Sequence, residues 1–349
     1  MEKLLTVCIP TYNMEALLGR CLDSFILDQE TMDKLQILVV NDGSKDNSSK
    51  IGHEYEAKYP NTFKVIDKPN GNYGSCINAA LKVATGKYFR ICDSDDRYEN
   101  ANLKGYIALL QSTSADIVFS PYYILDFDSK LNQKMDAAPV ENGMEMSISD
   151  IDWSDKNYIK YRAMHCMAVK TKNLTSHNYV QTEGISYTDT QFVFYSVLYS
   201  DTCVFYEKPI YYYYLGRDGQ TMSLPSMIKS NMHFYQNANK MLQTYVKIPS
   251  GMGDNKRDLL FRCIKTVMNF YVGIVIADIK DSNNQCNLIN EILKQSQTSI
   301  IPCPLFESLM DNFYFRLWKK YHVCPLIIYY MTKLKHKMNH GTKLCQKSV

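Results

Sequence analysis

The chain has 349 residues, of which 46% are hydrophobic and 21% charged, and its formal net charge is +3. This composition is that of an ordinary globular protein rather than a disordered one, and the small net charge gives no case for a nucleic acid partner. The length allows one large domain with an appendage, or two domains. From Arg316 onward there are eight of the 39 basic residues and none of the 36 acidic ones, so a mildly acidic body precedes a basic tail.

The eleven cysteines are scattered and include no CxxC pair. Cys8 and Cys92 lie in apolar runs, so we expect buried thiols in a reducing compartment rather than disulfides or zinc ligands. The N-terminus lacks the long apolar run and cleavage site of a signal peptide. The longest apolar stretches, 267–277 and 324–331, are shorter than the ~20 residues of a spanning helix. The chain is therefore expected to be cytoplasmic.

In the first 125 residues, apolar runs typical of strands alternate with segments of helical spacing. The predicted elements are strands at 4–9, 36–40, 63–66 and 88–92, and helices at 14–27, 48–58 and 77–84, the last ended by Gly86. This alternation predicts a mostly parallel sheet with right-handed crossovers. The continuous apolar strands indicate that helices cover both faces of the sheet.

Beyond residue 125 the pattern is looser. Residues 126–150 are polar and rich in turn-forming residues, which is typical of a loop or an insertion. Residues 157–215 return to mixed helix and strand and end in "PIYYYYL", which we interpret as an edge strand. From about residue 226 the spacing is helical, and the predicted helices are 226–247, 254–277, 284–296 and 304–321.

Three polar segments fall at the carboxyl ends of predicted strands, where open parallel sheets bind ligands: 10–13, 41–46 and 93–96. Asp93, Asp95 and Asp96 would repel one another in a dry site, so the cluster needs bulk water or a cation. Mg²⁺ and Mn²⁺ commonly take one or two carboxylates together with substrate phosphates. The alternative is a solvated acidic turn, and an Asp-x-Asp pair alone does not decide between the two.

The other two segments suit a nucleotide. Asp42 follows an apolar strand and could accept the imide N–H of a uracil, although Asp42 and Asp46 could instead make turns and helix caps. Thr11 and the ring of Tyr12 could bracket the base. Pro10 is expected to end its strand and fix the chain there.

Four stretches carry a family resemblance: "VCIPTYNMEALLGRCLDSF", "LVVNDGSKDNS", "NGNYGSCINAAL" and "GKYFRICDSDD". With them the chain resembles the inverting nucleotide-sugar glycosyltransferases of family 2, which have the GT-A fold. Asn41 stands where the family usually has Asp. The resemblance implies transfer of a sugar from a UDP-sugar to a hydroxyl of a glycan or polyprenyl-linked acceptor, with Mn²⁺ or Mg²⁺, in bacterial cell-surface polysaccharide synthesis.

The resemblance also implies site residues in this sequence. The nucleotide would be bound by Pro10, Thr11, Tyr12, Asn13, Asp42, Asn70, Asp93 and Ser94. Asp95 would be the metal ligand, and Asp93 would contact both the ribose and the metal. Asp96 would contact the groups around the metal rather than the metal itself.

The base of an inverting transfer is implied further along, in "QTEGISYTDTQFVFYSVL". Asp189 stands at the base position, with Thr188 where the family often has Glu. Glu183 is an alternative base, and Asp189 could instead cap the helix that follows it. Arg217, in a glycine-bearing loop, could neutralise the leaving diphosphate or lie on a solvated turn. His165 has no partner at metal-ligand spacing, so we expect it to be a packing residue.

The predicted architecture is α/β: a GT-A domain over 1–224, with a nucleotide-binding half (1–125) and an acceptor and base half (126–224), followed by a C-terminal helical region (225–349). The basic tail could lie on an anionic membrane, which would place the protein at the inner face of the plasma membrane, or pack on the body.

A catalytically silent UDP-binding scaffold is the alternative from another class, because it needs Asp42 and Asp95 but no base. A sugar-nucleotide pyrophosphorylase would need a glycine-rich loop after the first strand, and a NAD-dependent oxidoreductase would need G-x-G-x-x-G. The sequence offers neither.

Overall fold

The computed structural model describes residues 2–126, 128, 130–217, 220–221, 223–277 and 320. The chain forms two compact units. The first unit consists of residues 1–220 and 249–263, and the second of residues 221–248 and 264–349.

The secondary structure follows the chain as alternating strands and helices in its first third. The strands are β1 (Leu5–Thr11), β2 (Leu35–Asn41), β3 (Phe63–Asp67), β4 (Tyr88–Ile91), β5 (Arg97–Tyr98), β6 (Ile117–Phe119), β7 (Tyr122–Asp126), β8 (Leu131–Lys134), β9 (Glu145–Ser147), β10 (Met167–Lys170), β11 (Thr202–Phe205) and β12 (Tyr211–Leu215). The α-helices are α1 (Leu18–Asp23), α2 (Gln29–Asp33), α3 (Ser48–Lys58), α4 (Asn72–Leu81), α5 (Asn100–Ser112), α6 (Thr171–Thr175), α7 (Asp189–Leu198), α8 (Leu224–Lys229), α9 (Asn231–Tyr245) and α10 (Asp254–Ala277).

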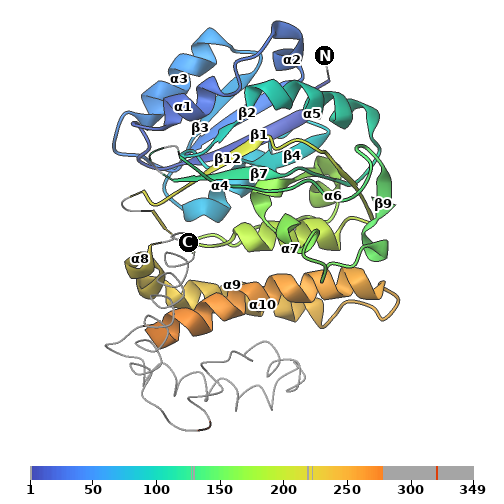
Figure 1. Cartoon of the computed structure of the whole chain (residues 1–349). Coiled ribbons are helices and arrows are strands. Elements are labelled where there is room, and N and C mark those ends of the chain that lie inside the picture. Colours follow the sequence, from blue (N-terminus) through green and yellow to red (C-terminus); the bar gives the residue numbers. More distant parts are fainter. Residues whose placement is uncertain are drawn as a thin grey trace, which may run out of the picture. The chain divides into compact units, whose positions relative to one another are not determined.

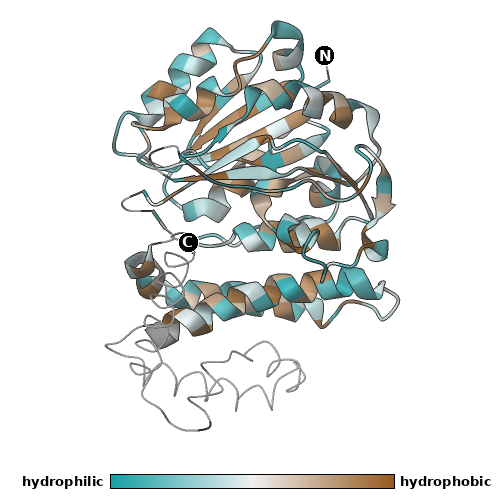
Figure 2. Cartoon of the chain, viewed as in Figure 1, coloured by the Kyte–Doolittle hydropathy of each residue, from teal (hydrophilic) through white to brown (hydrophobic). Residues whose placement is uncertain are grey.

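The main sheet of the first unit has the strand order β3-β2-β1-β4-β10-β6-β11-β9. Strands β1 to β4 are parallel, whereas β10 runs antiparallel to both of its neighbours. Helices α1, α3 and α5 cover one face, and α4, α6 and α7 cover the other (Figure 1). All seven residues of β1 are buried, as a strand covered on both faces requires, and hydrophobic residues concentrate in the central strands (Figure 2). The predicted α/β fold, with a largely parallel sheet flanked by helices, is confirmed.

Strand β1 does not end at Pro10, contrary to expectation. It continues to Thr11, with Pro10 opposite Val40 of β2. On its other side the pairing with β4 ends at Cys8. Proline lacks a backbone N–H, so it fits where the neighbouring ladder has already ended.

One further expectation from local pattern was wrong, and another was incomplete. Helix α4 ends at Leu81, so Gly86 does not terminate it. Gly86 instead packs against β1, where an added Cβ would lie 2.4 Å from the backbone N of Thr6. Residues 126–150 are not only loop, because β8 and β9 form there as edge strands on two different sheets. Such exposed edge pairing leaves little hydrophobic pattern in the sequence.

A second sheet has the order β5-β12-β7-β8. The tyrosine run forms β12, which pairs with β5 on one side and with β7 on the other. The expectation of an edge strand was therefore wrong. Because β5 directly follows residues 93–96, this sheet positions the tyrosines of β12 against that segment.

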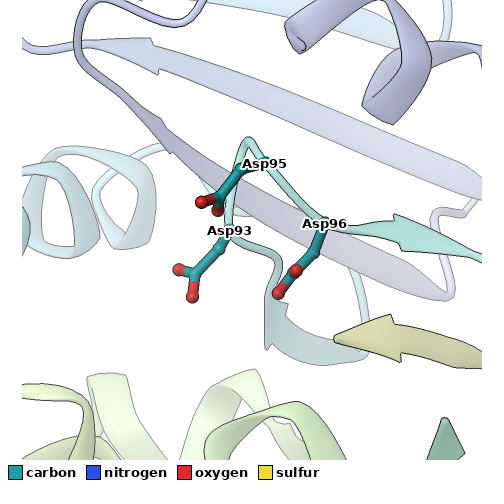
Figure 3. A group of neighbouring side chains, drawn as sticks. All are labelled: Asp93, Asp95 and Asp96. Carbon is teal, nitrogen blue, oxygen red and sulfur yellow. The ribbon is translucent and has the colours of Figure 1, made fainter. Parts of the chain in front are cut away.

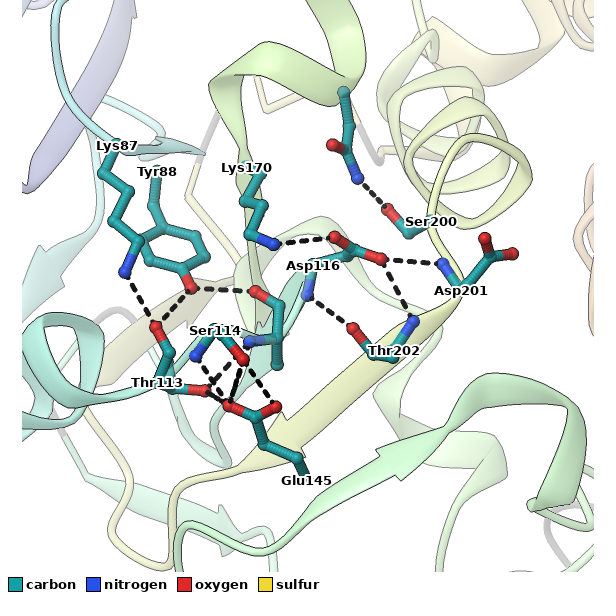
Figure 4. A network of polar contacts seen from close by, with 12 residues as sticks. Lys87, Tyr88, Thr113, Ser114, Asp116, Glu145, Lys170, Ser200, Asp201 and Thr202 are labelled. Carbon is teal, nitrogen blue, oxygen red and sulfur yellow. Dashed lines mark hydrogen bonds and ion pairs between the residues drawn. The ribbon is translucent and has the colours of Figure 1, made fainter.

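A polar network lies in the main sheet of the first unit (Figure 4). Asp116, just before β6, accepts hydrogen bonds from Lys170 Nζ and from the backbone N–H groups of Asp201 and Thr202. Glu145 accepts from the hydroxyls of Thr113 and Ser114. These bonds tie β6, β9, β10 and β11 together, since each carboxylate bridges segments distant in sequence.

The described part of the second unit contains α8, α9 and the residues of α10 from Ile264. Phe234 of α9 stacks on Phe270 of α10, with ring centroids 5.9 Å apart. Throughout the residues that can be described, no helix combines the length and hydrophobicity needed to cross a bilayer. The predicted helices 284–296 and 304–321, except Lys320, and the basic tail lie outside the described residues.

Candidate active site

The chain turns sharply after β4, and residues 93–96, the acidic turn, bring three carboxylates together. Oxygen atoms of Asp93, Asp95 and Asp96 all lie within 4.8 Å of one another. Their carboxylate groups point toward the same side of the turn (Figure 3). Each of the three has different hydrogen-bond partners, and these partners separate their roles.

Asp96 is 1% exposed, and both of its carboxylate oxygens are occupied. Oδ2 accepts a 2.6 Å hydrogen bond from the Tyr211 hydroxyl, and Oδ1 accepts one of 2.8 Å from the backbone N–H of Tyr214. Both donors belong to β12. Asp96 therefore fastens β12 to the acidic turn, which leaves Asp93 and Asp95 as the carboxylates available to a ligand.

Asp93 is half-buried and accepts a 2.8 Å hydrogen bond from the Tyr73 hydroxyl. Burial raises the pKa of Asp93 to about 7, the negative charge of Asp95 adds to the shift, and the bond from Tyr73 opposes it. A cation between Asp93 and Asp95 would favour the ionised form of both carboxylates and so lower the pKa of Asp93 again.

Asp95 carries its own counter-ion in this structure. Its Oδ2 accepts hydrogen bonds from Arg217, at 3.0 Å from Nη2 and 3.2 Å from Nε. Its backbone carbonyl accepts a 2.7 Å bond from Nη2 of Arg20. The sequence left Arg217 open between a diphosphate role and a solvated turn, and the structure brings its side chain to the acidic turn.

Asp42 lies just beyond the end of β2 and is 4% exposed. Its Oδ1 accepts bonds from Lys68 Nζ at 2.5 Å and from the backbone N–H of Gly71 at 2.9 Å. Asn70 Nδ2 donates to the backbone carbonyl of Asp42 at 2.9 Å. Asp42 and Asn70, both expected at the nucleotide, are thus in direct contact. Lys68 carried no signal in the sequence, because only the fold places it beside Asp42.

The other residues expected at the nucleotide lie at the ends of β1 and β4. Thr11 is buried, and its hydroxyl donates to the carbonyl of Ile9, whereas Tyr12 is 47% exposed. Asn13 has a φ of 54°, in the left-handed region that Asn tolerates, and its side chain accepts from the N–H of Lys45. Ser94 is buried within the acidic turn. An aromatic ring at the surface beside buried polar groups offers a face on which a base can stack.

The departure at Asn41 has a physical reason. Its Nδ2 donates a 2.7 Å hydrogen bond to Oδ1 of Asp67 at the end of β3, and its Oδ1 accepts from the N–H of Ser44. An aspartate could not donate to Asp67, and two carboxylates would repel each other there. The amide therefore fits its neighbours in this chain.

Asp189 is the first residue of α7, and Thr188, rather than Asp189, occupies the N-cap position. Burial raises the pKa of Asp189, while backbone N–H groups at the start of the helix oppose the shift. The charge of Asp189 in turn raises the pKa of Asp93. The structure thus brings Asp189 into electrostatic range of the acidic turn, although 93 positions separate Asp189 from Asp96.

The segment before Asp189 is held against α4. Asn78 of α4 exchanges two 2.9 Å hydrogen bonds with the backbone of Gln181, and Gln181 Nε2 donates to the Thr188 carbonyl. Tyr187 has a φ of 63°, a conformation that bulky residues rarely adopt. Such strain persists where the surroundings fix the backbone, often at functional sites. The alternative base, Glu183, is exposed and accepts a 2.8 Å bond from Asn78.

His165 is a packing residue, as expected. Its ring stacks on those of Tyr211 and Tyr213, with centroids 5.6 and 4.8 Å away. Burial lowers the pKa of His165 to about 3, and the charge of Arg90 adds to the shift. The imidazole is therefore neutral at physiological pH and is not a proton carrier for the site.

Comparisons with known proteins find similarity to glycosyltransferases over part of the chain. Residues 6–174 match the family model described as glycosyl transferase family 2. An uncharacterized glycosyltransferase of Mycoplasma pneumoniae is 43% identical over 97 residues, 27% of this chain and 32% of that protein. The minor teichoic acid biosynthesis protein GgaB of Bacillus subtilis is 32% identical over 123 residues, 35% of this chain and 14% of its own length.

The chain thus matches about a third or less of the length of these curated relatives. Among solved structures, S. aureus TarS in complex with UDP-GlcNAc superposes with a TM-score of 0.62 at 19% identity. The superposition covers 83% of this chain and 81% of that one. At this identity the likeness concerns the fold.

Proposed function

We propose that this chain, whose residues 6–174 match the model of glycosyl transferase family 2, transfers a sugar from a UDP-sugar to an acceptor hydroxyl with inversion. The observation that carries the proposal is the meeting of three groups at one edge of the sheet. They are the acidic turn, Asp42 beyond β2, and Asp189 at the start of α7, whose charge reaches Asp93.

The nucleotide would lie between the ends of β1 and β2. Asp42 Oδ1 is held by Lys68 and Gly71, so the second oxygen of the same carboxylate is the acceptor for the imide N–H of uracil. Tyr12, exposed at the end of β1, would stack on the base, with Pro10 and Thr11 setting its position. Asn13, Asn70 and Ser94 complete this lining. The UDP-GlcNAc bound by TarS supports a UDP-sugar as the donor.

The donor set fits a divalent cation. Asp93 and Asp95 present hard oxygen ligands at one turn, and oxygens of the two carboxylates lie within 4.8 Å of each other. These two residues would hold Mn²⁺ or Mg²⁺ together with the donor diphosphate. When bound, the ion would neutralise the diphosphate and so make UDP a better leaving group.

The chain's own residues would perform the transfer. Asp189 accepts the proton of the acceptor hydroxyl, and the oxygen attacks the anomeric carbon of the sugar from the face opposite to UDP. The bond from that carbon to the diphosphate oxygen breaks, and UDP leaves with the electron pair. Arg217, already at Asp95, supplies positive charge to the departing diphosphate. A single displacement of this kind inverts the configuration.

The acceptor would be a glycan or lipid-linked sugar of the bacterial cell surface. The relationship to GgaB, a teichoic acid biosynthesis protein, supports this context. Peripheral contact of the basic tail with the membrane stays a prediction, as does the division into a catalytic domain over 1–224 and a helical region over 225–349.

The test is UDP release by the full chain across a panel of UDP-sugars with Mn²⁺ or Mg²⁺ and candidate acceptors. We expect turnover with at least one donor, and its loss in Asp95→Asn and Asp189→Asn. The two variants should differ in binding. Asp95→Asn should lose metal-dependent UDP binding in calorimetry, whereas Asp189→Asn should keep it.

The matched control is Asp136→Asn, which removes an exposed carboxylate far along the chain from the acidic turn. This variant should turn over like the wild type. If the chain binds UDP but transfers no sugar with any combination of donor, metal and acceptor, the silent scaffold is favoured instead. The absence of both binding and turnover would refute the proposal.

A further inference from the structure

A cavity of about 480 Å³ opens on the first unit beside the acidic turn. Its lining residues come from four elements: Arg20, Asp23 and Ser24 from α1 and its C-terminal end, Arg97 from β5, Asn100 from α5, and Tyr214 from β12. The volume lies in the range of small-molecule sites. None of these residues has a role in the transfer described above.

Arg20 borders both the cavity and the acidic turn. Nη2 donates to the backbone carbonyl of Asp95, and the guanidinium carbon lies 4.0 Å from the ring centroid of Tyr214. Its Nε is buried and has no hydrogen-bond partner among the residues that the structure describes. A buried donor without a partner is destabilising, so a ligand that accepts from this guanidinium would offset the cost.

Arg97 is the second cation of the cavity. Its Nε donates a 2.9 Å hydrogen bond to the Tyr214 hydroxyl, and its guanidinium carbon lies 4.2 Å from the ring centroid of Tyr212. Within the described residues, neither Arg20 nor Arg97 forms a salt bridge, in contrast to Arg217 and Arg262. Two guanidinium groups therefore face this cavity without a paired carboxylate.

The negative charge that lines the cavity is smaller than the positive charge. Among the described lining residues Asp23 is the lone carboxylate, and its Oδ1 already accepts a 2.6 Å hydrogen bond from the Tyr55 hydroxyl. The lining thus has an excess of positive charge. Planar guanidinium groups bind phosphate and carboxylate through paired hydrogen bonds, which makes such an anion the complementary ligand.

We propose that this cavity binds an anionic group, a phosphate or a carboxylate, carried by the acceptor. This assignment rests on the proposed glycosyl transfer, and it names a chemical property of the acceptor. Ser24 and Asn100 at the same cavity could meet hydroxyls of the acceptor next to its anionic group. Because Arg20 bonds the backbone of Asp95, the cavity lies next to the acidic turn.

The donor diphosphate is the competing occupant, and the arrangement of the elements disfavours it. Asp42, Asn70 and Gly71, the contacts assigned to the nucleotide, come from the end of β2 and the start of α4. The cavity takes no lining residue from either element. Asp95 separates the two regions, since its carboxylate meets Arg217 and its carbonyl meets Arg20.

The experiment is calorimetry of the full chain at low ionic strength with EDTA, titrating inorganic phosphate, glycerol 3-phosphate and glucuronate separately. We expect glycerol 3-phosphate or glucuronate to bind, and Arg97→Gln to weaken that binding by at least about tenfold. Arg97→Lys keeps the charge but not the planar fork, so its affinity should be intermediate. Thermal melting of each variant checks that it is folded.

The matched control is Lys104→Gln on α5, which removes one positive charge from a side chain that is 70% exposed. Its affinity should stay within about twofold of wild type, because an exposed charge is screened by solvent. UDP binding with Mn²⁺ should be equal in Arg97→Gln and wild type, because Arg97 lies outside the nucleotide contacts.

Three outcomes would overturn the proposal: no binding of any of the three anions, binding that is lost in Asp42→Ala but kept in Arg97→Gln, or inorganic phosphate binding tighter than glycerol 3-phosphate and glucuronate. The last would identify a site for free phosphate. Anion binding that depends on Arg97 in a chain that does not bind UDP would support the cavity and remove the proposed transfer. The experiments can therefore refute either proposal without refuting the other.

Discussion

Arg217 and Asp95 form an ion pair across 122 positions of sequence, with Nη2 of the arginine 3.0 Å from Oδ2 of the carboxylate. Both side chains are largely buried, at 23% and 14% exposed. The guanidinium thus occupies one of the two oxygens through which Asp95 could hold a cation. On the function proposed above, a metal ion and Arg217 would compete for Asp95 in the free protein.

Substitution Arg217→Gln should therefore act in opposite directions on metal binding and on turnover. Without nucleotide, Mn²⁺ affinity should rise by roughly three- to tenfold, because Asp95 loses its competing cation. UDP-sugar turnover should fall by about 10- to 100-fold, because the leaving diphosphate loses a charged donor. Calorimetry and UDP release measure the two effects. Lys64→Gln, at an exposed position of β3, is the control, and an unchanged Mn²⁺ affinity in Arg217→Gln would contradict the competition.

The pH dependence of transfer should report Asp189. A base must be ionised to accept a proton, and burial raises the pKa of Asp189 above its ordinary 3.8. The rate should therefore fall as the pH is lowered through that raised pKa, and should level off above it. In Asp189→Asn the residual rate should lose this dependence. If wild type and variant show the same acid limb at saturating metal, the limb belongs to another group.

The loss of folding stability at acid pH should depend on protonation of His165. Its pKa is lowered to about 3 in the folded chain from an ordinary 6.5, so the unfolded chain binds more protons between these values. The stability conferred by the neutral imidazole is complete above about pH 6.5 and is lost as the pH falls toward 3. Between pH 7 and pH 4, His165→Phe should reduce the loss of unfolding free energy by on the order of 2–3 kcal/mol.

Urea unfolding of wild type and His165→Phe at both pH values measures that difference. Phenylalanine keeps the ring between Tyr211 and Tyr213, so the two proteins should agree within about 1 kcal/mol at pH 7. His177→Phe, at an exposed position, is the control. Equal losses in wild type and His165→Phe would show that the imidazole does not govern acid stability.

The packing of α4 should set the position of the segment that leads to Asp189. A Cβ at Gly74 would lie 1.9 Å from the Thr182 carbonyl oxygen, so Gly74→Ala must displace one of the two backbones. We expect a loss of about 1–3 kcal/mol in unfolding free energy. The transfer rate of the folded variant should fall as well, because residues 181–188 lead directly into Asp189. Gly251→Ala, where an added Cβ meets no atom of the described residues within 4 Å, should change neither quantity appreciably.

The strands and helices of residues 1–125 could be predicted because each depends on residues that are close together in the sequence. Apolar runs of β1 to β4 and the spacing of α3, predicted at 48–58 and found at Ser48–Lys58, follow from neighbouring residues alone. The same holds for the acidic turn, since the carboxyl ends of parallel strands meet at one edge. The strands β8 and β9 gave no such signal, because they pair at exposed edges where either face tolerates polar residues.

By itself, the sequence determined which groups could do chemistry: carboxylates at the end of a buried strand, and a distant aspartate before a helix. The tertiary structure decided which partner each of these carboxylates has. Asp96 is committed to β12, Asp95 is paired with Arg217, and Asp93 is held by Tyr73. Hydrogen bonds and charge act over a few ångströms of space, whereas the chain separates these partners by 20 to 122 positions. Only folding brings them within that range.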